Sequence, residues 1–312
     1  MKYDLIFAGV AIVDSLIKGF DPEPISKSGF RAESGALHVG GEAVNGSMAA
    51  AKLGMKTAIL CHLGKDEAGD MIRGALVRSG VDVSLIASSG EHPTPVTTMF
   101  VHEDGTRRSI TNGAHRYNFH PERYADCFGE AKGIVLGSLF RAPFDDPDVI
   151  GEVLKQAKER DLPVFADTKL PNFRFLTLED LKGSLPLIDY ITPNEDEARY
   201  YTEKDTPEEM ADVLLGYGVK NVLIKLGGEG CFFKNPDIQI SLPALPIDAV
   251  DATGAGDNFL AGFASEIIRG ASIEEALCFA NACGAVCTTA VGAGTALTGR
   301  AQVEEFMKKY NQ

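Results

Sequence analysis

The chain has 312 residues, 45% of them hydrophobic and 24% charged, a composition typical of globular proteins and unlike that of disordered or fibrous ones. Its 30 lysines and arginines against 44 aspartates and glutamates give a formal net charge of −14, which repels nucleic acids and anionic membrane surfaces. We therefore expect neither nucleic acid nor membrane as a partner, and no apolar run is long enough for a transmembrane helix.

The cysteines and histidines give no sign of a metal or redox centre. The six cysteines never form a C-x-x-C pair, and three of them fall within one expected helix. The six histidines lack the spacing of a zinc site. Reduced, buried thiols are typical of a cytoplasmic protein, and this is the location that we predict.

Short apolar segments alternate with amphipathic ones along most of the chain. Residues 1–14 contain a predicted buried strand, because no small-residue cleavage site follows the apolar run. A strand within 56–64 is followed by helical periodicity over 66–80, and further strands are expected within 133–139, 162–167, 187–194 and 220–227. Strands that are apolar on both faces predict an α/β fold, in which helices cover both faces of a mostly parallel central sheet.

Two stretches interrupt this alternation. Residues 15–39 and 94–112 show turn signals and alternating side chains but no helical period. Asp104-Gly105 marks the turn of an expected hairpin within 97–111. We expect the two stretches to pair into a small separate sheet. Residues 1–14, 40–93 and 113–312 are then one α/β core, since no long linker divides them.

A glycine turn at residues 251–259, DATGAGDNF, precedes a helical pattern that Gly270 is expected to end. The first amides of a helix lack internal partners, and the sequence Gly254, Ala255, Gly256 lets an anion approach them. Asp257 follows directly, and a carboxylate there could accept a proton from a hydroxyl that attacks a phosphoryl group. The alternative is a simple cap, with Thr253 as N-cap and Asp257 as a favourable first-turn acid.

Two segments resemble the signatures of one enzyme family. Residues 251–263, DATGAGDNFLAGF, are similar to the C-terminal signature of the ribokinase-like (PfkB) carbohydrate kinases, and residues 40–54, GGEAVNGSMAAAKLG, resemble their N-terminal glycine-pair signature. The likeness extends from Asp14 to the last helix. It implies a ribokinase-like fold, ATP-dependent phosphorylation of a sugar hydroxyl, and a β-lid made of 15–39 and 94–112 that covers the sugar. Lid edges often pair between subunits, so a homodimer is also expected.

The resemblance assigns roles to residues at the two signatures. It makes Asp257 the general base and the amides of Gly254, Ala255 and Gly256 the anion hole for the phosphoryl group. The helix dipole should lower the pKa of Asp257 and make it a weak base. A loose transition state tolerates this, because proton removal comes late.

The same resemblance places sugar-hydroxyl ligands near the N-terminus, namely Asp14, Gly41 and Asn45. A carboxylate and an amide offer the directed acceptors and donors that a polyol needs. The alternative is structural: Asp14 at the end of the first strand is a strand cap, and the glycine pair Gly40-Gly41 only permits a turn into the next helix.

Further positions resemble the family's nucleotide and metal sites. Asn194 and Glu197 match an N-x-x-E motif near Mg²⁺ and the phosphates, although the same spacing is that of a capping box. Residues 225–230, KLGGEG, resemble the segment along ATP, with Lys225 where a small hydroxyl residue is more usual. The remaining matches are Gly227, Gly230 and Asn281 beside the nucleotide, and Asp251, Thr253, Cys287, Ala290 and Gly292 around a possible K⁺ ion.

The acceptor is left open by the sequence. Arg107 is assigned to substrate binding, and it could, with Arg108, Arg141 and Lys169, contact a sugar acid or sugar phosphate, or all four could be solvated. Phe140 stands where ribokinases place a carboxylate, which argues against ribose. A nucleoside or sugar phosphate acceptor, a catalytically silent sugar-binding regulator, and an oxidoreductase on an α/β sheet are the alternatives; the missing third glycine of a dinucleotide motif disfavours the last.

Overall fold

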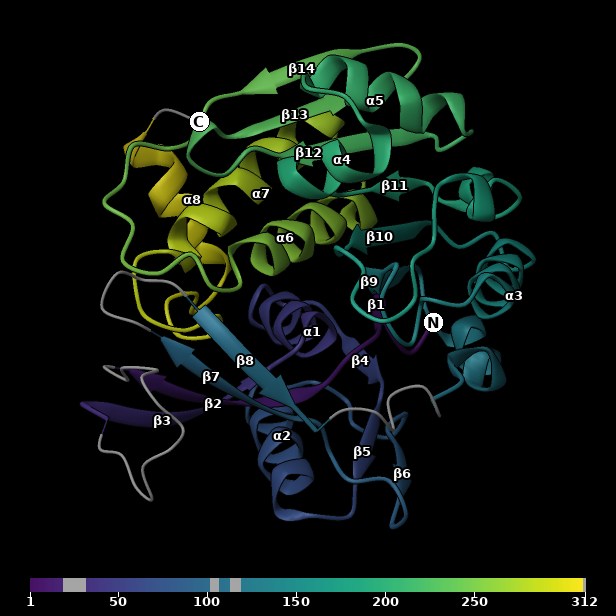
Figure 1. Cartoon of the computed structure of the whole chain (residues 1–312). Coiled ribbons are helices and arrows are strands. Elements are labelled where there is room, and N and C mark those ends of the chain that lie inside the picture. The colour runs from purple at the N-terminus through teal and green to yellow at the C-terminus, as the bar shows by residue number, and fades with distance from the viewer. Residues whose placement is uncertain (19–31, 102–106, 113–118, 311–312) are drawn as a thin grey trace.

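The computed structural model describes residues 1–18, 32–101, 107–112 and 119–310 (Figure 1). Its central sheet has eight strands: β1 (Leu5–Ala8), β4 (Thr57–Leu60), β9 (Ile134–Leu139), β10 (Val164–Thr168), β11 (Tyr190–Ile191), β12 (Asn221–Lys225), β13 (Cys231–Lys234) and β14 (Gln239–Leu242). They lie in the order β14-β13-β12-β11-β10-β9-β1-β4. All neighbours pair in parallel except at the β14 end, where β12, β13 and β14 are antiparallel. The predicted mostly parallel sheet is confirmed.

Helices cover both faces of this sheet, as the alternation predicted. One face carries α1 (Glu42–Lys52), α2 (Glu67–Arg78), α6 (Ala255–Arg269), α7 (Ile273–Cys287) and α8 (Arg300–Lys309). The other carries α3 (Pro147–Lys158), α4 (Glu195–Thr202), α5 (Pro207–Gly216) and the short 3₁₀ helices η2 (Pro121–Glu130), η3 (Glu179–Leu181) and η4 (Leu185–Leu187).

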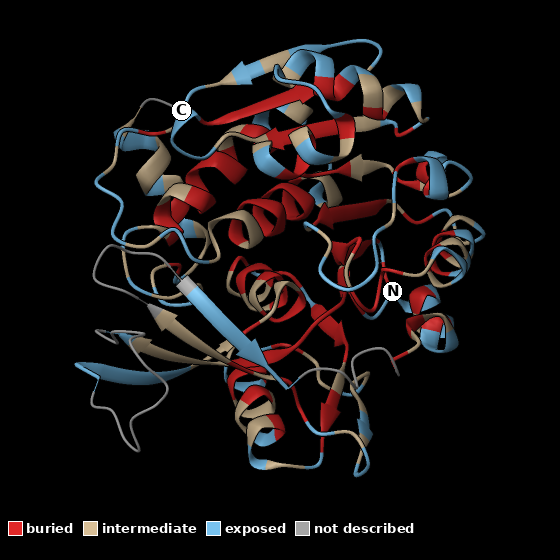
Figure 2. Ribbon diagram, in the orientation of Figure 1, coloured by how far each residue is buried: buried red, intermediate tan, exposed pale blue. Residues whose placement is uncertain are grey.

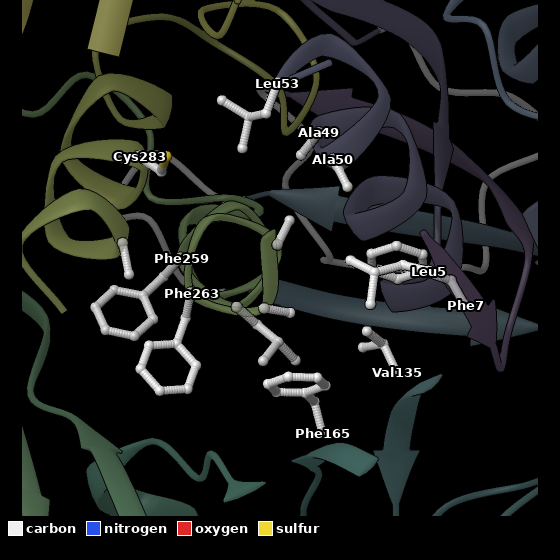
Figure 3. Close-up of a cluster of buried hydrophobic side chains, with 14 of the residues drawn as sticks. Leu5, Phe7, Ala49, Ala50, Leu53, Val135, Phe165, Phe259, Phe263 and Cys283 are labelled. Carbon is white, nitrogen blue, oxygen red and sulfur yellow. The ribbon is translucent and has the colours of Figure 1, made fainter. Parts of the chain in front are cut away.

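Two cores follow from the two-residue repeat of the strands. In β9, Val135 packs under α1 and α6, whereas Ile134 and Leu136 pack on the opposite face (Figure 3). Most strands are buried on both sides and the outer helices on one, which Figure 2 shows as red inner strands and helices of mixed colour. The edge strand β14 is exposed at alternate residues, and α6 is buried over most of its length. Helix α6 ends as predicted, because Gly270 adopts a left-handed φ of 87° at its C-cap.

A second, four-stranded sheet stands apart from the central one (Figure 1). It is built from β2 (Ile12–Lys18), β3 (Ser34–Gly40), β7 (Val96–Val101) and β8 (Arg107–Thr111), in the order β3-β2-β7-β8. The two interrupting stretches therefore do pair in space, through the parallel contact of β2 with β7. Strands β7 and β8 pair as a hairpin, but its expected turn at Asp104-Gly105 lies outside the described residues.

This small sheet has little core of its own. The described part of β8 and most of β3 are exposed, including the apolar side chains of Leu37 and Ile110 (Figure 2). A separate pair of short strands, β5 (His62–Gly64) and β6 (Ala87–Ser89), follows β4 and α2. All six cysteines are free thiols, and no helix in the described part of the chain is long and apolar enough to cross a membrane.

Candidate active site

The carboxyl ends of the parallel strands gather the polar residues of the candidate site. Strand β10 ends in Asp167 and Thr168, Asn194 follows β11, and β12 ends in Lys225. Open parallel sheets bind ligands at this edge, outside the strand ends. The start of α6 lies at the same edge, since a Cβ on Gly256 would come within 3.3 Å of the Lys225 Nζ.

Helix α6 begins at a turn whose N-cap position, residue 254, has room for glycine alone. Gly254 is the N-cap, with a left-handed φ of 78°, and no side chain caps the helix. A Cβ at Gly254 would lie 2.2 Å from the Cβ of Ala293, so the turn can press against the loop after α7 only because Gly254 has no side chain. Thr253 is not the N-cap, and the capping alternative is wrong on this point: its hydroxyl donates to Asp251 Oδ1 at 2.7 Å.

The backbone amides of this turn are only partly used within the protein. The amide of Ala255 closes the turn by donating to the Ala252 carbonyl at 3.2 Å. Gly256 and Asp257 come next in the first turn of α6, where amides have no partner four residues back. An anion at this N-terminus would meet these donors together with the positive end of the helix dipole.

Asp257 lies in this first turn, partly shielded from solvent. Asn45 of α1 donates its Nδ2 to Asp257 Oδ2 at 2.7 Å, which joins the two signatures of the sequence. Burial raises the pKa of Asp257 to about 7; Glu42 and Asp167 add to the increase, and Lys169 and the Asn45 hydrogen bond oppose it. The expectation of a lowered pKa is wrong, because desolvation and neighbouring carboxylates outweigh the helix dipole.

Asp14 lies on the small sheet. The prediction that it ends the first strand is wrong: β1 ends at Ala8, and Asp14 is in β2, opposite His38 of β3 and Thr97 of β7. The chain leaves the central sheet after β1 and carries Asp14 onto the neighbouring one. Burial raises the pKa of the Asp14 carboxyl, Glu42 adds to this, and His38 opposes it.

The glycine pair before α1 has two structural duties. Gly41 is the helix N-cap, with φ at 96°, and a Cβ there would lie 2.3 Å from the Val10 carbonyl oxygen. A Cβ on Gly40 would lie 2.3 Å from Asp14 Oδ2. The pair therefore permits the turn into α1 and also leaves room for the Asp14 carboxylate.

A cavity of about 190 Å³ lies between the small sheet and the glycine turn, and we call it the acceptor cavity. Asp14 and Asn45 line it from the N-terminal part of the chain. The other lining residues are Leu16, Lys18, His38, Val39, Gly40, Met99, Val250, Asp251, Thr253, Val291, Gly292 and Ala293. The structure thus brings two of the predicted sugar ligands together with the residues around the turn.

An ion pair next to Asp257 was not predicted. Lys169 Nζ, just after β10, lies 3.0 Å from Glu42 Oε1 at the first position of α1. Although burial opposes it, Lys169 and the Ser138 hydroxyl hold the pKa of Glu42 at about 2. Glu42 stands inside the N-terminal signature, but nothing local in the sequence points to a partner so far along the chain.

The other cations considered for an anionic acceptor are differently placed. Arg141 donates its Nε to the Leu170 carbonyl at 2.7 Å, and Arg108 is exposed on β8. The side chain of Arg107 lies outside the described residues. Phe140 is buried and stacks on Tyr201 with ring centroids 3.9 Å apart, so it offers no polar group.

Asn194 and Glu197 form the capping box that the sequence offered as an alternative. Asn194 Oδ1 accepts from the Glu197 amide at 2.9 Å, and Glu197 Oε2 accepts from the Asn194 amide at 3.0 Å. Thr168 also donates its hydroxyl to Glu197 Oε2 at 2.8 Å. Burial raises the pKa of Glu197, Asp167 adds to it, and Lys225 opposes it. No group of three or more metal-ligating acids, histidines or cysteines occurs among the described residues.

A larger pocket of about 550 Å³ lies on the other side of the glycine turn. Lys225, Gly227, Gly230, Asn281 and Gly256 line it, together with apolar residues before and within α6 and α7. Four of the predicted nucleotide residues are therefore brought together, whereas Asn194 pairs with Lys225 through an isolated β-bridge but does not line the pocket. Lys225 is the one charged residue in this lining, and its Nζ lies 2.6 Å from Asp167 Oδ1.

The pocket's shape depends on close backbone approaches. Gly230, with φ at 104°, ends the short helix η5 (Gly227–Glu229), and a Cβ there would lie 2.0 Å from the Leu242 carbonyl oxygen. Asn281 is buried and donates its Nδ2 to the Pro243 carbonyl at 2.8 Å. The Asn281 amide is therefore held by the backbone and not by solvent.

The loop after α7 is tied to the glycine turn by a buried amide. Asn258 Nδ2 lies 2.9 Å from both the Gly254 and Ala293 carbonyls. Cys287 Sγ lies 3.5 Å from the Thr253 carbonyl and the same distance from that of Ala293. Carbonyl groups of the two loops thus converge on one place.

Asp251 braces the same two loops. Its Oδ1 accepts from Thr253, and its Oδ2 accepts from the Gly292 amide at 2.9 Å. Ala290 lies in the turn between α7 and Gly292. Of the five residues predicted around a K⁺ ion, four therefore belong to the two loops that meet at the glycine turn, and the fifth, Cys287, is the last residue of α7.

Known proteins share both the sequence and this architecture. The model of the pfkB family carbohydrate kinases matches residues 8–299. A ribokinase of Arabidopsis thaliana is 32% identical, covering 97% of this chain and 81% of that protein, and the 2-dehydro-3-deoxygluconokinase of Bacillus subtilis is 29% identical, covering 88% and 90%. The solved structure of Arabidopsis thaliana ribokinase complexed with ribose and ATP superposes with a TM-score of 0.87 at 28% identity, covering 99% of both chains.

These matches cover nearly the whole chain and include both signatures. Relatives of different specificity, ribokinase and 2-dehydro-3-deoxygluconokinase, share the phosphotransfer to an alcohol and differ in the acceptor. The chain belongs to the pfkB family of carbohydrate kinases and is an alcohol-accepting phosphotransferase of that family.

Proposed function

We propose that this kinase transfers the terminal phosphoryl group of ATP to a hydroxyl of a sugar or sugar derivative held in the acceptor cavity, with Asp257 as general base. One observation carries the proposal. Gly256 lines the 550 Å³ pocket, and the next residue, Asp257, bonds to Asn45, which lines the acceptor cavity. Two consecutive residues thus stand at the boundary between the two spaces.

The chemistry follows from this position. The acceptor oxygen attacks the terminal phosphorus, the bond from phosphorus to the bridging oxygen of ADP breaks, and the hydroxyl proton passes to Asp257. The amides of Gly254 and Gly256 and the α6 dipole stabilise the negative charge on the moving group, and the Ala255 amide joins them on leaving the Ala252 carbonyl to which it donates here. Asn45 holds the Asp257 carboxylate, and Asp14, Gly41 and Asn45 orient the sugar.

The nucleotide residues have matching chemistry. Gly227, Gly230 and Asn281 form the neutral part of the pocket, and Lys225 supplies a positive charge where the phosphates would end. The relative that superposes on this chain is complexed with ribose and ATP, which supports ATP as the donor. Asn194 and Glu197 would hold Mg²⁺ through water, which suits an ion that retains most of its own ligands and neutralises phosphate charge.

The remaining parts of the proposal concern the cation, the lid and the assembly. The converging carbonyls near Cys287 suit a K⁺ ion beside the anion hole, with Asp251, Thr253, Ala290 and Gly292 around it. The small sheet, at the open side of the acceptor cavity, would close over the sugar and exclude water. Its exposed Leu37 and Ile110 suit a homodimer contact in a cytoplasmic enzyme.

The experiment is a coupled ADP-release assay over sugars, sugar acids, sugar phosphates and nucleosides. It is run with Mg²⁺, with and without K⁺, on the parent and on Asp257→Asn. ADP release that requires an acceptor and falls roughly a hundredfold or more on the substitution supports the proposal. The alternative is the silent sugar-binding regulator: binding of sugar by calorimetry without ADP release from any acceptor would favour it and refute the kinase mechanism.

A further inference from the structure

Carboxylates outnumber cations between the acceptor cavity and the start of α6. Glu42 and Asp257 line one small cavity together, and Glu42 also raises the pKa of Asp14. Three carboxylates therefore act on one another around the place where the proposed function puts the acceptor hydroxyl. Lys169 is the cation that acts on both Glu42 and Asp257.

Lys169 is already neutralised within the protein. Its Nζ lies 3.0 Å from Glu42 Oε1, and the Glu42 side chain is only 17% exposed. The backbone at Glu42 is fixed, because it is the first residue of α1, directly after Gly41, whose backbone fits tightly against Val10. The Ser138 hydroxyl also bonds to Glu42. A carboxylate or phosphate on the substrate would have to displace Glu42 or lie among like charges, which is costly.

Among the residues that the structure describes, no other cation near the acceptor cavity compensates for this. Lys18 lines the outer end of the cavity, but it is exposed and lies four residues beyond Asp14 along β2, about 13 Å at ~3.3 Å per residue. His38 lies opposite Asp14 on the neighbouring strand and acts electrostatically on that carboxylate. Arg141 is bound to a backbone carbonyl and Arg108 is exposed on β8.

We infer that the acceptor is an uncharged sugar or polyol, and that the Glu42–Lys169 ion pair is the specificity element that excludes sugar acids and sugar phosphates. The inference rests on the proposed function, since Glu42 lines a small cavity with Asp257, the proposed base, and not the acceptor cavity itself. Glu42 occupies Lys169 in an ion pair, so this lysine is not available to bind an anionic substrate. Removing the Glu42 carboxylate should convert a site for neutral sugars into one that accepts carboxylates.

The test compares neutral probes, D-ribose and D-fructose, with anionic probes, D-gluconate and D-fructose 6-phosphate. Binding is measured by calorimetry and turnover by ADP release, and each variant is scored by its ratio of anionic to neutral probe. A ratio within one variant cancels any effect of Glu42 on the base. The parent should favour the neutral probes, and Glu42→Gln should raise the gluconate ratio roughly tenfold or more, the value of one charge-assisted hydrogen bond.

Matched variants separate the release of Lys169 from its ion pair from a non-specific effect of the substitution on the site. The double variant with Glu42→Gln and Lys169→Met should lose the gain, because it no longer contains the lysine that would bind the anionic probe. Lys169→Met alone should keep the low ratio of the parent for the same reason. Glu67→Gln makes the same change at the first position of α2, where the side chain is exposed, and should change nothing.

The outcomes distinguish this inference from the proposed function. A parent that binds the anionic probes better, or a Glu42→Gln variant with an unchanged ratio, would overturn the inference even if turnover is robust. Neutral-sugar preference in calorimetry with no turnover of any probe would support the inference and refute the kinase mechanism.

Discussion

Replacing Asp257 by asparagine tests the base directly. Asparagine has the same shape and can still accept the 2.7 Å hydrogen bond from Asn45 through its carbonyl oxygen, so the contact between α1 and α6 should persist. What is lost is the proton acceptor. We expect binding of nucleotide and sugar to be retained and turnover to fall roughly 10²–10⁴-fold, the usual contribution of general acid–base catalysis.

The pH dependence sharpens this prediction. With the pKa of Asp257 at about 7, the parent has about half of its base ionised at pH 7 and about nine tenths at pH 8, so its turnover should rise nearly twofold over that interval. The variant should show no such rise. The dependence is followed by ADP release at saturating sugar and nucleotide between pH 6 and pH 9, after calorimetry has shown that both still bind.

A matched control is available in another helix. Asp70 also lies in the first turn of its helix, α2, but is exposed, so Asp70→Asn should leave turnover unchanged. Turnover of Asp257→Asn within a factor of three of the parent would show that another group takes the proton. A parent profile that stays flat between pH 6 and pH 8 would refute the assigned pKa direction, because a carboxylate with an ordinary pKa is already ionised at pH 6.

Three further predictions concern stability and the nucleotide. Because folding raises the pKa of Asp257, its ionisation lowers the free energy of unfolding of the parent as pH rises from about 4 towards 7. Asp257→Asn should therefore have a higher melting temperature than the parent at pH 8 and nearly the same one at pH 4. An equal increase in melting temperature at both pH values would contradict this. Gly254→Ala and Gly270→Ala each place a side chain on a residue with a left-handed φ, which costs about 1–2 kcal/mol, but only the Cβ at position 254 meets another atom. Denaturant unfolding should therefore show a larger loss of unfolding free energy for Gly254→Ala, and this variant should also lose turnover. Lys225→Met should lower kcat/KM for ATP roughly 10- to 100-fold, the value of a charge-assisted bond, and an unchanged value would remove Lys225 from the nucleotide site.

Local signals in the sequence predicted well. Gly270 ends α6 because a left-handed residue terminates a helix whatever surrounds it. The Asn194–Glu197 capping box is a matter of two residues three positions apart. The strand and helix periods likewise needed only neighbours in the sequence, and they were enough to place the carboxyl ends of the strands and thus the edge where the site lies.

Features that depend on distant partners could not be read in this way. The Glu42–Lys169 pair exists because the end of β10 faces the start of α1, and sequence spacing carries no trace of that contact. The pKa of Asp257 was predicted in the wrong direction for the same reason. The dipole of its own helix was visible in the sequence, whereas burial and the carboxylates of Glu42 and Asp167, on other elements, were not. Asp14 was misplaced because the change from one sheet to the other leaves β1 and β2 looking like one apolar run.

The Asn258 amide gives the enzyme a mechanical linkage. By bonding to the Gly254 and Ala293 carbonyls, one side chain fastens the turn and the loop after α7 to the same buried point. A shift of the turn is therefore coupled to a shift of the loop after α7. A ligand that orders this loop would also restrict the motion of the amides at the start of α6 without contacting them. Rigidity in this part of the molecule is therefore a shared property, and it can be tuned from a distance.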